Sequence, residues 1–178
     1  RLLIKNLDKN SRIISTTGYT SRELYSLRKS YNKLGKDFYV VGGMGHTSMI
    51  SLGVALNKKK VFCIDGDGAM LMHFGSLRTI GFYKSRFFKH ILLNNNCHES
   101  VGGQDSTFKG LNMKKISKFL GYKNYYLIKN EANINKTLKK FKNSNGPSLL
   151  EVLIKVGTEK NLVRPINFYK IKNNFMRW

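Results

Sequence analysis

"CIDGDGAML", residues 63 to 71, ends an apolar run at an aspartate, Asp67, that stands between two glycines. The run before it, residues 60–65, is short and almost continuously apolar, as is typical of a strand buried on both faces. The residues after it have helical spacing, beginning at about Ala69. The stretch therefore predicts a buried strand and a helix, joined by a connection that carries a glycine-flanked carboxylate.

The same alternation of strand and helix continues through the whole chain. Further strands are predicted for residues 12–16, 37–41, 89–94, 124–128 and 148–155, and helices for residues 20–32, 46–57, 69–83, 111–121 and 131–143. This order favours a three-layer α/β domain with a mostly parallel central sheet. Ligands of such sheets bind beyond the carboxyl ends of the strands, so we expect the site in the loops after residues 16, 41, 65 and 94.

Length and composition favour one domain over residues 1–178. The chain has 41% hydrophobic and 12% aromatic side chains, enough for one sizeable core. The tail, residues 157–178, has no clear period, and we expect it to wrap the domain or to dock on a neighbour. Because the chain opens on Arg1 rather than Met, we expect a piece or a processed form of a longer protein.

Membrane and secretory classes are not favoured. No stretch approaches the roughly 20 apolar residues that cross a bilayer, and the N-terminus lacks the ordered regions of a secretory signal. The two cysteines, Cys63 and Cys97, form no CxxC pair and predict neither a disulfide framework nor a zinc site. A cytoplasmic protein without a membrane partner is therefore expected.

The charge is strongly positive, with 32 Lys and Arg against 10 Asp and Glu, a formal net charge of +22. Such a charge favours acidic partners, although solvated faces combined with codon bias would give the same composition. A basic nucleic-acid-binding module is the non-enzyme alternative, and it should carry aromatic stacking positions among its basic residues. The aromatic residues here lie largely within apolar runs, so we expect no nucleic-acid partner.

The connection around Asp67 suggests a metal-bridged phosphate site. Glycines at 66 and 68 allow close backbone approach, and the first free N–H groups of the following helix attract anions. A phosphate would be repelled by Asp67 unless a hard cation such as Mg²⁺ lay between them, with one or two protein oxygens as ligands. The second oxygen is expected from Asn94–Asn96, which follow Gly68 after 25 intervening residues at the end of another strand.

This GDG, 25 residues and NN arrangement resembles the signature of thiamine diphosphate enzymes. The resemblance implies thiamine diphosphate and Mg²⁺ as cofactors. It also implies Asp67, Asn95 and the backbone carbonyl of Cys97 as metal ligands. Asn96 departs from the glycine usual at that position, which affects the shape of the loop but removes no ligand.

Two other loops are similar to further cofactor segments of that family. "TTGYT" resembles the diphosphate-contacting turn and "GGMGH" the segment that holds the aminopyrimidine, with Met44 wedged beneath the cofactor. A methionine at a strand end is otherwise ordinary core filling. The resemblance implies a cofactor-binding set of Thr17, Gly18, Gly42, Met44, Gly66, Asp67, Gly68, Ala69, Asn95, Cys97, His98 and Glu99.

Several segments, among them "GGMGHTSMISLGVAL" and "NNNCHESVGGQ", narrow the resemblance to the diphosphate-binding domain of the phosphonopyruvate decarboxylases. This implies decarboxylation of 3-phosphonopyruvate to phosphonoacetaldehyde and CO₂, a step in phosphonate biosynthesis. A sulfopyruvate or other 2-oxo acid decarboxylase remains the alternative. A nicotinamide-binding domain is less favoured, because "GGMG" is not a GxGxxG that opens a helix.

The resemblance also implies residues at the substrate and a missing partner. His98 and Ser100 are candidates for the substrate pocket, although a loop histidine is often only a hydrogen-bonding surface group. His46 is expected at a helix start, while His73 and His90 look structural or solvated. The family needs a second, pyrimidine-binding domain or subunit, so we expect a homo- or hetero-oligomer in which this chain alone is inactive.

Overall fold

The computed structural model describes residues 2–7, 11–31 and 36–177, and all six strands in this part of the chain form one parallel sheet. The order across the sheet is β2-β1-β3-β4-β6-β5. The strands are β1 Arg12–Ser15, β2 Phe38–Tyr39, β3 Val61–Gly66, β4 Phe88–Asn94, β5 Asn124–Ile128 and β6 Ser148–Leu153.

Helices connect the strands and cover both faces of the sheet. They are α1 Leu2–Asn6, α2 Tyr19–Ser30, α3 Thr47–Leu56, α4 Asp67–Met72, α5 Ser76–Tyr83, α6 Met113–Phe119, α7 Ile134–Asn143 and α8 Phe168–Met176, with 3₁₀ turns η1 Glu99–Val101 and η2 Glu131–Asn133. Within the described ranges, no helix combines the length and the apolar character that a membrane crossing requires.

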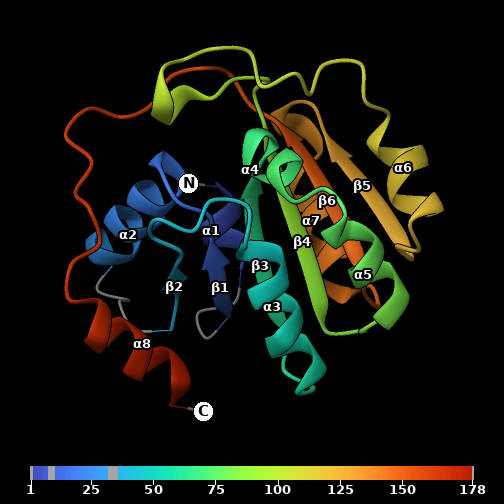
Figure 1. The fold of residues 1–178 in the computed structure, drawn as a ribbon, viewed down its shortest axis with the longest axis horizontal. Coiled ribbons are helices and arrows are strands. Elements are labelled where there is room, and N and C mark those ends of the chain that lie inside the picture. The colour runs from blue at the N-terminus through green and yellow to red at the C-terminus, as the bar shows by residue number, and fades with distance from the viewer. Residues whose placement is uncertain (1, 8–10, 32–35, 178) are drawn as a thin grey trace.

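Two apolar clusters, one on each face of the sheet, give the fold three layers (Figure 1). One face packs on α3, α4, α5 and α6, and the other on α1, α2 and α7. The predicted three-layer α/β architecture with a parallel sheet is confirmed.

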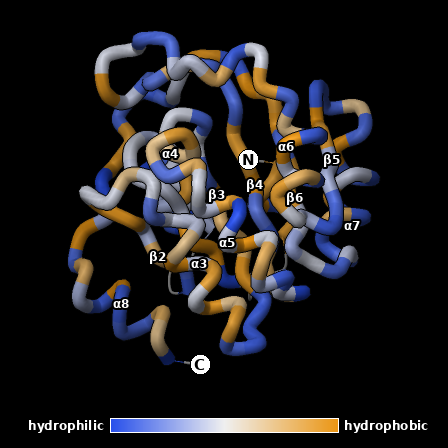
Figure 2. Tube along the Cα trace, turned by 45° about the vertical axis from the view of Figure 1, so that its right-hand side comes forward, coloured by the Kyte–Doolittle hydropathy of each residue, from blue (hydrophilic) through white to orange (hydrophobic). Residues whose placement is uncertain are grey.

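The inner strands are buried on both faces, which explains why their sequences do not alternate between apolar and polar residues. In β3, the five residues from Val61 to Asp65 are all buried, and its neighbour β4 is similar. Figure 2 shows orange, apolar segments along the central strands and blue segments in the outer helices and loops. The core therefore lies along the middle of the sheet and leads directly to the residues after Asp65.

The helix predicted over residues 69–83 is wrong in its length, because the structure divides it in two. The first part, α4, begins at Asp67 and ends at Met72, and α5 begins at Ser76. Gly75 lies in the turn between them, and a glycine favours interruption because it loses more backbone entropy in a helix than other residues do. Asp67 is consequently the first residue of a helix and not part of a loop before one.

Other boundaries differ by a few residues. The strand expected over residues 37–41 is reduced to Phe38–Tyr39, and the one expected to reach residue 155 ends at Leu153. The end of the helix predicted over residues 20–32 lies outside the described residues. The short α1 and the tail helix α8 were not predicted, since neither has a clear helical period over enough residues.

The course of the chain places the site loops at the carboxyl ends of the strands, next to the point where the strand order reverses. β1 lies between β2 and β3, so the chain moves outward from β1 to β2 and then returns across β1 to form β3. Crevices at such reversals are the usual ligand positions of open parallel sheets. The loops after β1, β3 and β4 all start from these carboxyl ends.

The tail runs back along the domain. Gly157 donates its N–H to Glu99 at 2.7 Å, and Phe175 of α8 packs its ring 5.5 Å from that of Phe38 in β2. In Figure 1 the tail, drawn in orange to red, passes the end of the sheet and places α8 beside β2. Docking of the tail on a neighbouring subunit stays a prediction.

A buried ion pair joins α2 to the residue before β2, and we predict that its loss destabilises the domain. Arg28 donates Nε and an Nη to the two oxygens of Asp37 at 2.6 and 3.1 Å, with both side chains almost fully buried. Arg28→Met leaves Asp37 unpaired and should lower the free energy of unfolding by about 3–5 kcal/mol in urea titrations. Lys29→Met, the same change at the exposed neighbour, should change it by at most about 0.5 kcal/mol.

The double variant Arg28→Met with Asp37→Leu removes both charges and should recover much of the loss. Equal stability of the Arg28 and Lys29 variants would contradict this account.

Candidate active site

A cavity opens at the carboxyl ends of β1, β3 and β4, where the loops after these strands meet. It is lined also by the loop before α3, by the first turns of α2 and α4 and by the start of the tail. The predicted cofactor residues that line it are Thr17, Met44, Gly66, Asp67, Gly68, Ala69, Asn95, Cys97, His98 and Glu99. Ser100, predicted for the substrate pocket, lines it as well.

Asp67 and Asn95 meet at one point, although 27 residues separate them in the sequence. The backbone N–H of Cys97 lies 3.1 Å from Asp67 Oδ2 and 3.1 Å from Asn95 Oδ1. One amide hydrogen thus draws a carboxylate oxygen and an amide oxygen to the same place. Carboxylate and amide oxygens are the ligands that hard divalent cations prefer.

Ser106 is a further hydrogen-bond partner of Asp67, and sequence reasoning missed it. Its buried hydroxyl donates to Asp67 Oδ2 at 2.7 Å, and its N–H donates to the carbonyl of Asn96. The residue comes after the loop of residues 98–105, and only folding of that loop brings it back to Asp67 at the start of α4. No local signal in the sequence distinguishes it from other serines.

The three consecutive asparagines have different roles. Asn94 is buried and donates to Glu151 at 2.8 Å, so it belongs to the sheet and not to the cavity. Asn95 faces the cavity and donates its Nδ2 to Glu99 at 2.9 Å, which leaves Oδ1 turned toward Asp67. Asn96 has a positive φ of 56°, a conformation that glycine and asparagine adopt more readily than other residues.

Glycines let the neighbouring loops pack closely at two positions. A Cβ on Gly68 would lie 2.3 Å from the His98 ring, and one on Gly18 would lie 2.6 Å from Ser100 Oγ. Gly18 also has a φ of 79° at the residue before α2, which favours glycine there. The loop of residues 98–104 closes through hydrogen bonds from His98 N to the Gln104 carbonyl and from Gly103 N to the His98 carbonyl.

Two predicted cofactor residues, Gly18 and Gly42, do not line the cavity. Gly18 is half-buried at the residue before α2, whereas Gly42 is exposed in the segment that leads to Met44. His46 stands at the residue before α3, as expected, and its ring lies 4.3 Å from that of the exposed His73. The first turns of α2 add Thr20 and Glu23 to the lining, which sequence reasoning also missed.

The cavity is negatively charged despite the basic composition of the chain. Glu23, Asp67 and Glu99 line it, and no Lys or Arg among the described residues does. Partial burial raises the pKa of the Cys97 thiol, and the neighbouring carboxylates, Glu99 first among them, raise it further. The site therefore favours a cation and disfavours a free thiolate, so the residues present fit a bound divalent metal ion.

Comparisons with known proteins place the chain beside one enzyme family. The sequence model of the family described as "Thiamine pyrophosphate enzyme, C-terminal TPP binding domain" matches residues 16–152. The phosphonopyruvate decarboxylase of Streptomyces viridochromogenes is 33% identical over 164 residues, which are 92% of this chain and 40% of that protein. The chain thus spans less than half the length of this relative.

Sulfopyruvate decarboxylase subunits are similar over more of their length. The beta subunit from Methanothermobacter thermautotrophicus is 30% identical over 93% of this chain and 85% of its own. The beta subunit from Methanocaldococcus jannaschii is 37% identical over 67% of this chain and 62% of its own. A solved structure of a thiamin diphosphate-dependent enzyme isolated from Mycobacterium smegmatis matches 87% of this chain and 31% of its own, with a TM-score of 0.66 at 17% identity.

The packing of His98 on Gly68 generates a stability prediction. Gly68→Ala forces a methyl group into the imidazole and should cost about 1–3 kcal/mol, the usual range for overpacking. Gly66→Ala, two residues away, meets nothing within 4 Å and has a φ of −99° that any residue adopts, so its melting temperature should stay unchanged. Thermal unfolding of both variants measures the difference.

Adding His98→Ala to Gly68→Ala should relieve the clash and restore part of the stability. A double variant less stable than Gly68→Ala alone would contradict the contact.

Proposed function

The chain belongs to the thiamine pyrophosphate enzymes, as their C-terminal TPP-binding domain, and from this we propose that it binds thiamine diphosphate through a Mg²⁺ ion held by Asp67 and Asn95. The observation that carries the proposal is a shared hydrogen bond: Asp67 Oδ2 and Asn95 Oδ1 both accept the N–H of Cys97. The Cys97 carbonyl is the third proposed ligand. Mg²⁺ keeps few protein ligands and takes the rest from phosphate and water, which suits this small set.

The negative cavity supports a metal-bridged diphosphate over a directly bound one. Among the described residues, three carboxylates and no lysine or arginine line the cavity, so a diphosphate bound there directly would be repelled. A divalent cation reverses that repulsion, and the N-terminus of the 12-residue α2 adds a favourable dipole for an anion. Thr17, in the turn before α2, is proposed as a contact of the diphosphate.

The proposed reaction is decarboxylation of 3-phosphonopyruvate, with sulfopyruvate as the alternative substrate. The bond between the carboxylate and the keto carbon breaks, CO₂ leaves, and the electron pair stays on the former keto carbon until a proton gives the aldehyde. When bound, thiamine diphosphate supplies the electron sink for that pair. Relatives named for both activities support a 2-oxo acid with a second acidic group.

This chain's residues are proposed to bind and orient the reacting groups. Asp67 and Asn95 fix the metal, Met44 supports the cofactor from the loop before α3, and His98 and Ser100 face the substrate from the loop after β4. The two acidic groups of the substrate need cations that this cavity lacks. We propose that a pyrimidine-binding domain or subunit supplies them, consistent with relatives that are either longer or named as a beta subunit.

The metal proposal predicts a specific loss on charge removal. Asp67→Asn should weaken Mg²⁺-dependent binding of thiamine diphosphate by at least the roughly 10- to 100-fold seen when partners of metal ligands are removed. Asp105→Asn, the same change at an exposed position of the loop after β4, should leave the affinity unchanged. Calorimetric titration of the enzyme with its pyrimidine-binding partner gives both affinities, and equal values for the two variants would contradict the proposal.

The substrate proposal predicts a ranking. The chain combined with its pyrimidine-binding partner should release CO₂ from 3-phosphonopyruvate faster than from sulfopyruvate, and much faster than from pyruvate, while the chain alone should release none. Comparable rates on pyruvate and 3-phosphonopyruvate would remove the narrow assignment. Turnover by the isolated chain would contradict the need for a partner.

A further inference from the structure

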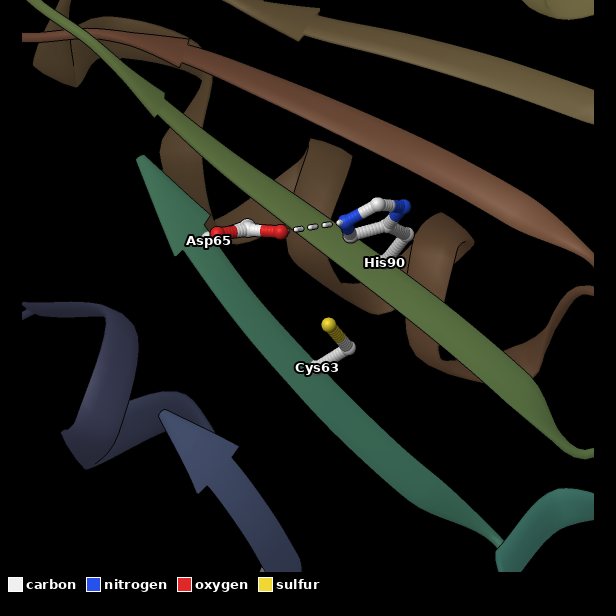
Figure 3. Close-up of side chains that lie close together, drawn as sticks. All are labelled: Cys63, Asp65 and His90. Atoms are coloured by element: carbon white, nitrogen blue, oxygen red, sulfur yellow. Dashed lines mark ion pairs between the residues drawn. The ribbon is translucent and has the colours of Figure 1, made fainter. Parts of the chain in front are cut away.

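The two side-chain ligands proposed for Mg²⁺, Asp67 and Asn95, are called the metal corner below. Beside the metal corner, β3 and β4 carry a polar cluster inside the core. Cys63 and Asp65 lie on the same face of β3, and His90 is the cross-strand partner of Cys63 on β4. All three side chains are almost completely buried. Figure 3 shows Asp65 and His90 facing each other, with the Cys63 sulfur pointing toward the space between them.

Two atoms of this cluster need a partner. Asp65 Oδ2 and His90 Nε2 are buried and make no hydrogen bond to any described residue, yet they lie only 3.7 Å apart. Buried polar atoms are nearly always hydrogen-bonded, and the usual N–H to O distance is about 2.9 Å. A small approach of these two side chains pairs both atoms at once.

The other ring nitrogen of His90 has a partner whose role depends on the direction of that bond. His90 Nδ1 lies 2.9 Å from the hydroxyl of Tyr122, which is buried after α6. Burial raises the pKa of Tyr122 well above its usual value, so the hydroxyl keeps its proton. A carboxylate oxygen only accepts, so a bond from His90 to Asp65 needs the histidine proton on Nε2, and the Tyr122 hydroxyl then donates to Nδ1.

We propose that Tyr122, His90 and Asp65 form a hydrogen-bonded relay that positions the metal corner. The bonds run from Tyr122 O–H to His90 Nδ1 and from His90 Nε2–H to Asp65 Oδ2. The other oxygen, Asp65 Oδ1, accepts the N–H of Gly66 at 3.1 Å. The relay thereby orients the peptide that leads into Asp67, and its three members are positioning residues of the site in the proposed function.

A bound zinc ion is the competing explanation of the cluster. The candidate ligand atoms of Cys63, Asp65 and His90 lie within 4.8 Å of one another. Structural zinc sites use four ligands, however, and this cluster offers three in a place that water cannot easily complete. Burial also raises the pKa of the Cys63 thiol, followed by the effect of Asp65, so a zinc ion would have to displace a proton from this sulfur in order to bind it. The relay, by contrast, needs neither a fourth ligand nor loss of the thiol proton.

The tautomer of His90 tests the relay directly. In ¹⁵N-histidine spectra of the full chain, with His90→Gln used for assignment, His90 should be neutral with its proton on Nε2. Asp65→Asn presents an N–H to Nε2 while keeping an acceptor for Gly66, so the proton should move to Nδ1. A wild-type histidine protonated on Nδ1 or on both nitrogens, or a tautomer unchanged by Asp65→Asn, would overturn the relay.

Metal affinity tests its positioning role. With saturating thiamine diphosphate and the pyrimidine-binding partner present, His90→Leu should weaken Mg²⁺ binding by roughly tenfold or more. His90→Gln keeps a donor toward Asp65 and should restore most of it, while Cys63→Ala should bind as the wild type does. His90→Leu with wild-type affinity would overturn the positioning role, whatever its melting temperature.

Metal analysis distinguishes the relay from a zinc cluster. The wild-type enzyme is the control that distinguishes failure of the relay from failure of the proposed function. One zinc per chain in the wild type, lost in both Cys63→Ala and His90→Gln, would overturn the relay in favour of a metal cluster. A wild-type enzyme that binds neither Mg²⁺ nor thiamine diphosphate would contradict the proposed function, and the relay would then be judged by the tautomer of His90 alone.

Discussion

The site depends on keeping a carboxylate buried at the end of a strand that is itself buried on both faces. Asp67 follows β3 directly and is almost inaccessible to solvent, a costly position for an unpaired charge. The Cys97 N–H and the Ser106 hydroxyl both donate to one of its oxygens. Both donors come from the segment after β4, so the carboxylate at the start of α4 determines how that segment must fold.

That requirement explains the shape of the whole loop after β4. Asn94 stays in the sheet, Asn95 turns its oxygen toward Asp67, and Asn96 adopts a left-handed conformation that reverses the chain. The loop then packs His98 on Gly68, where only a glycine leaves room for the ring. Geometry that looks like metal recognition is thus also what makes the buried carboxylate tolerable before any metal binds.

The sequence predicted the architecture and much of this arrangement, because apolar runs and glycine-flanked polar residues are local signals. The parallel sheet and the loops around Asp67 and Asn95 follow from them. Local signals could not predict Ser106, which is brought to Asp67 only by a closed loop, nor the exposure of Gly42. The break at Gly75 was missed for a different reason, since a single glycine does not reliably end an amphipathic pattern.

Glu99 has a further consequence, because its two oxygens serve different parts of the chain. One accepts the side-chain amide of Asn95, and the other accepts the N–H of Gly157 where the tail begins. A ligand that moves Glu99 relative to Asn95 therefore also acts on the hydrogen bond at the start of the tail, and where the two contacts are coupled the coupling free energy is the same in both directions. The start of the tail is in this way joined, through one carboxylate, to a residue that lines the cavity.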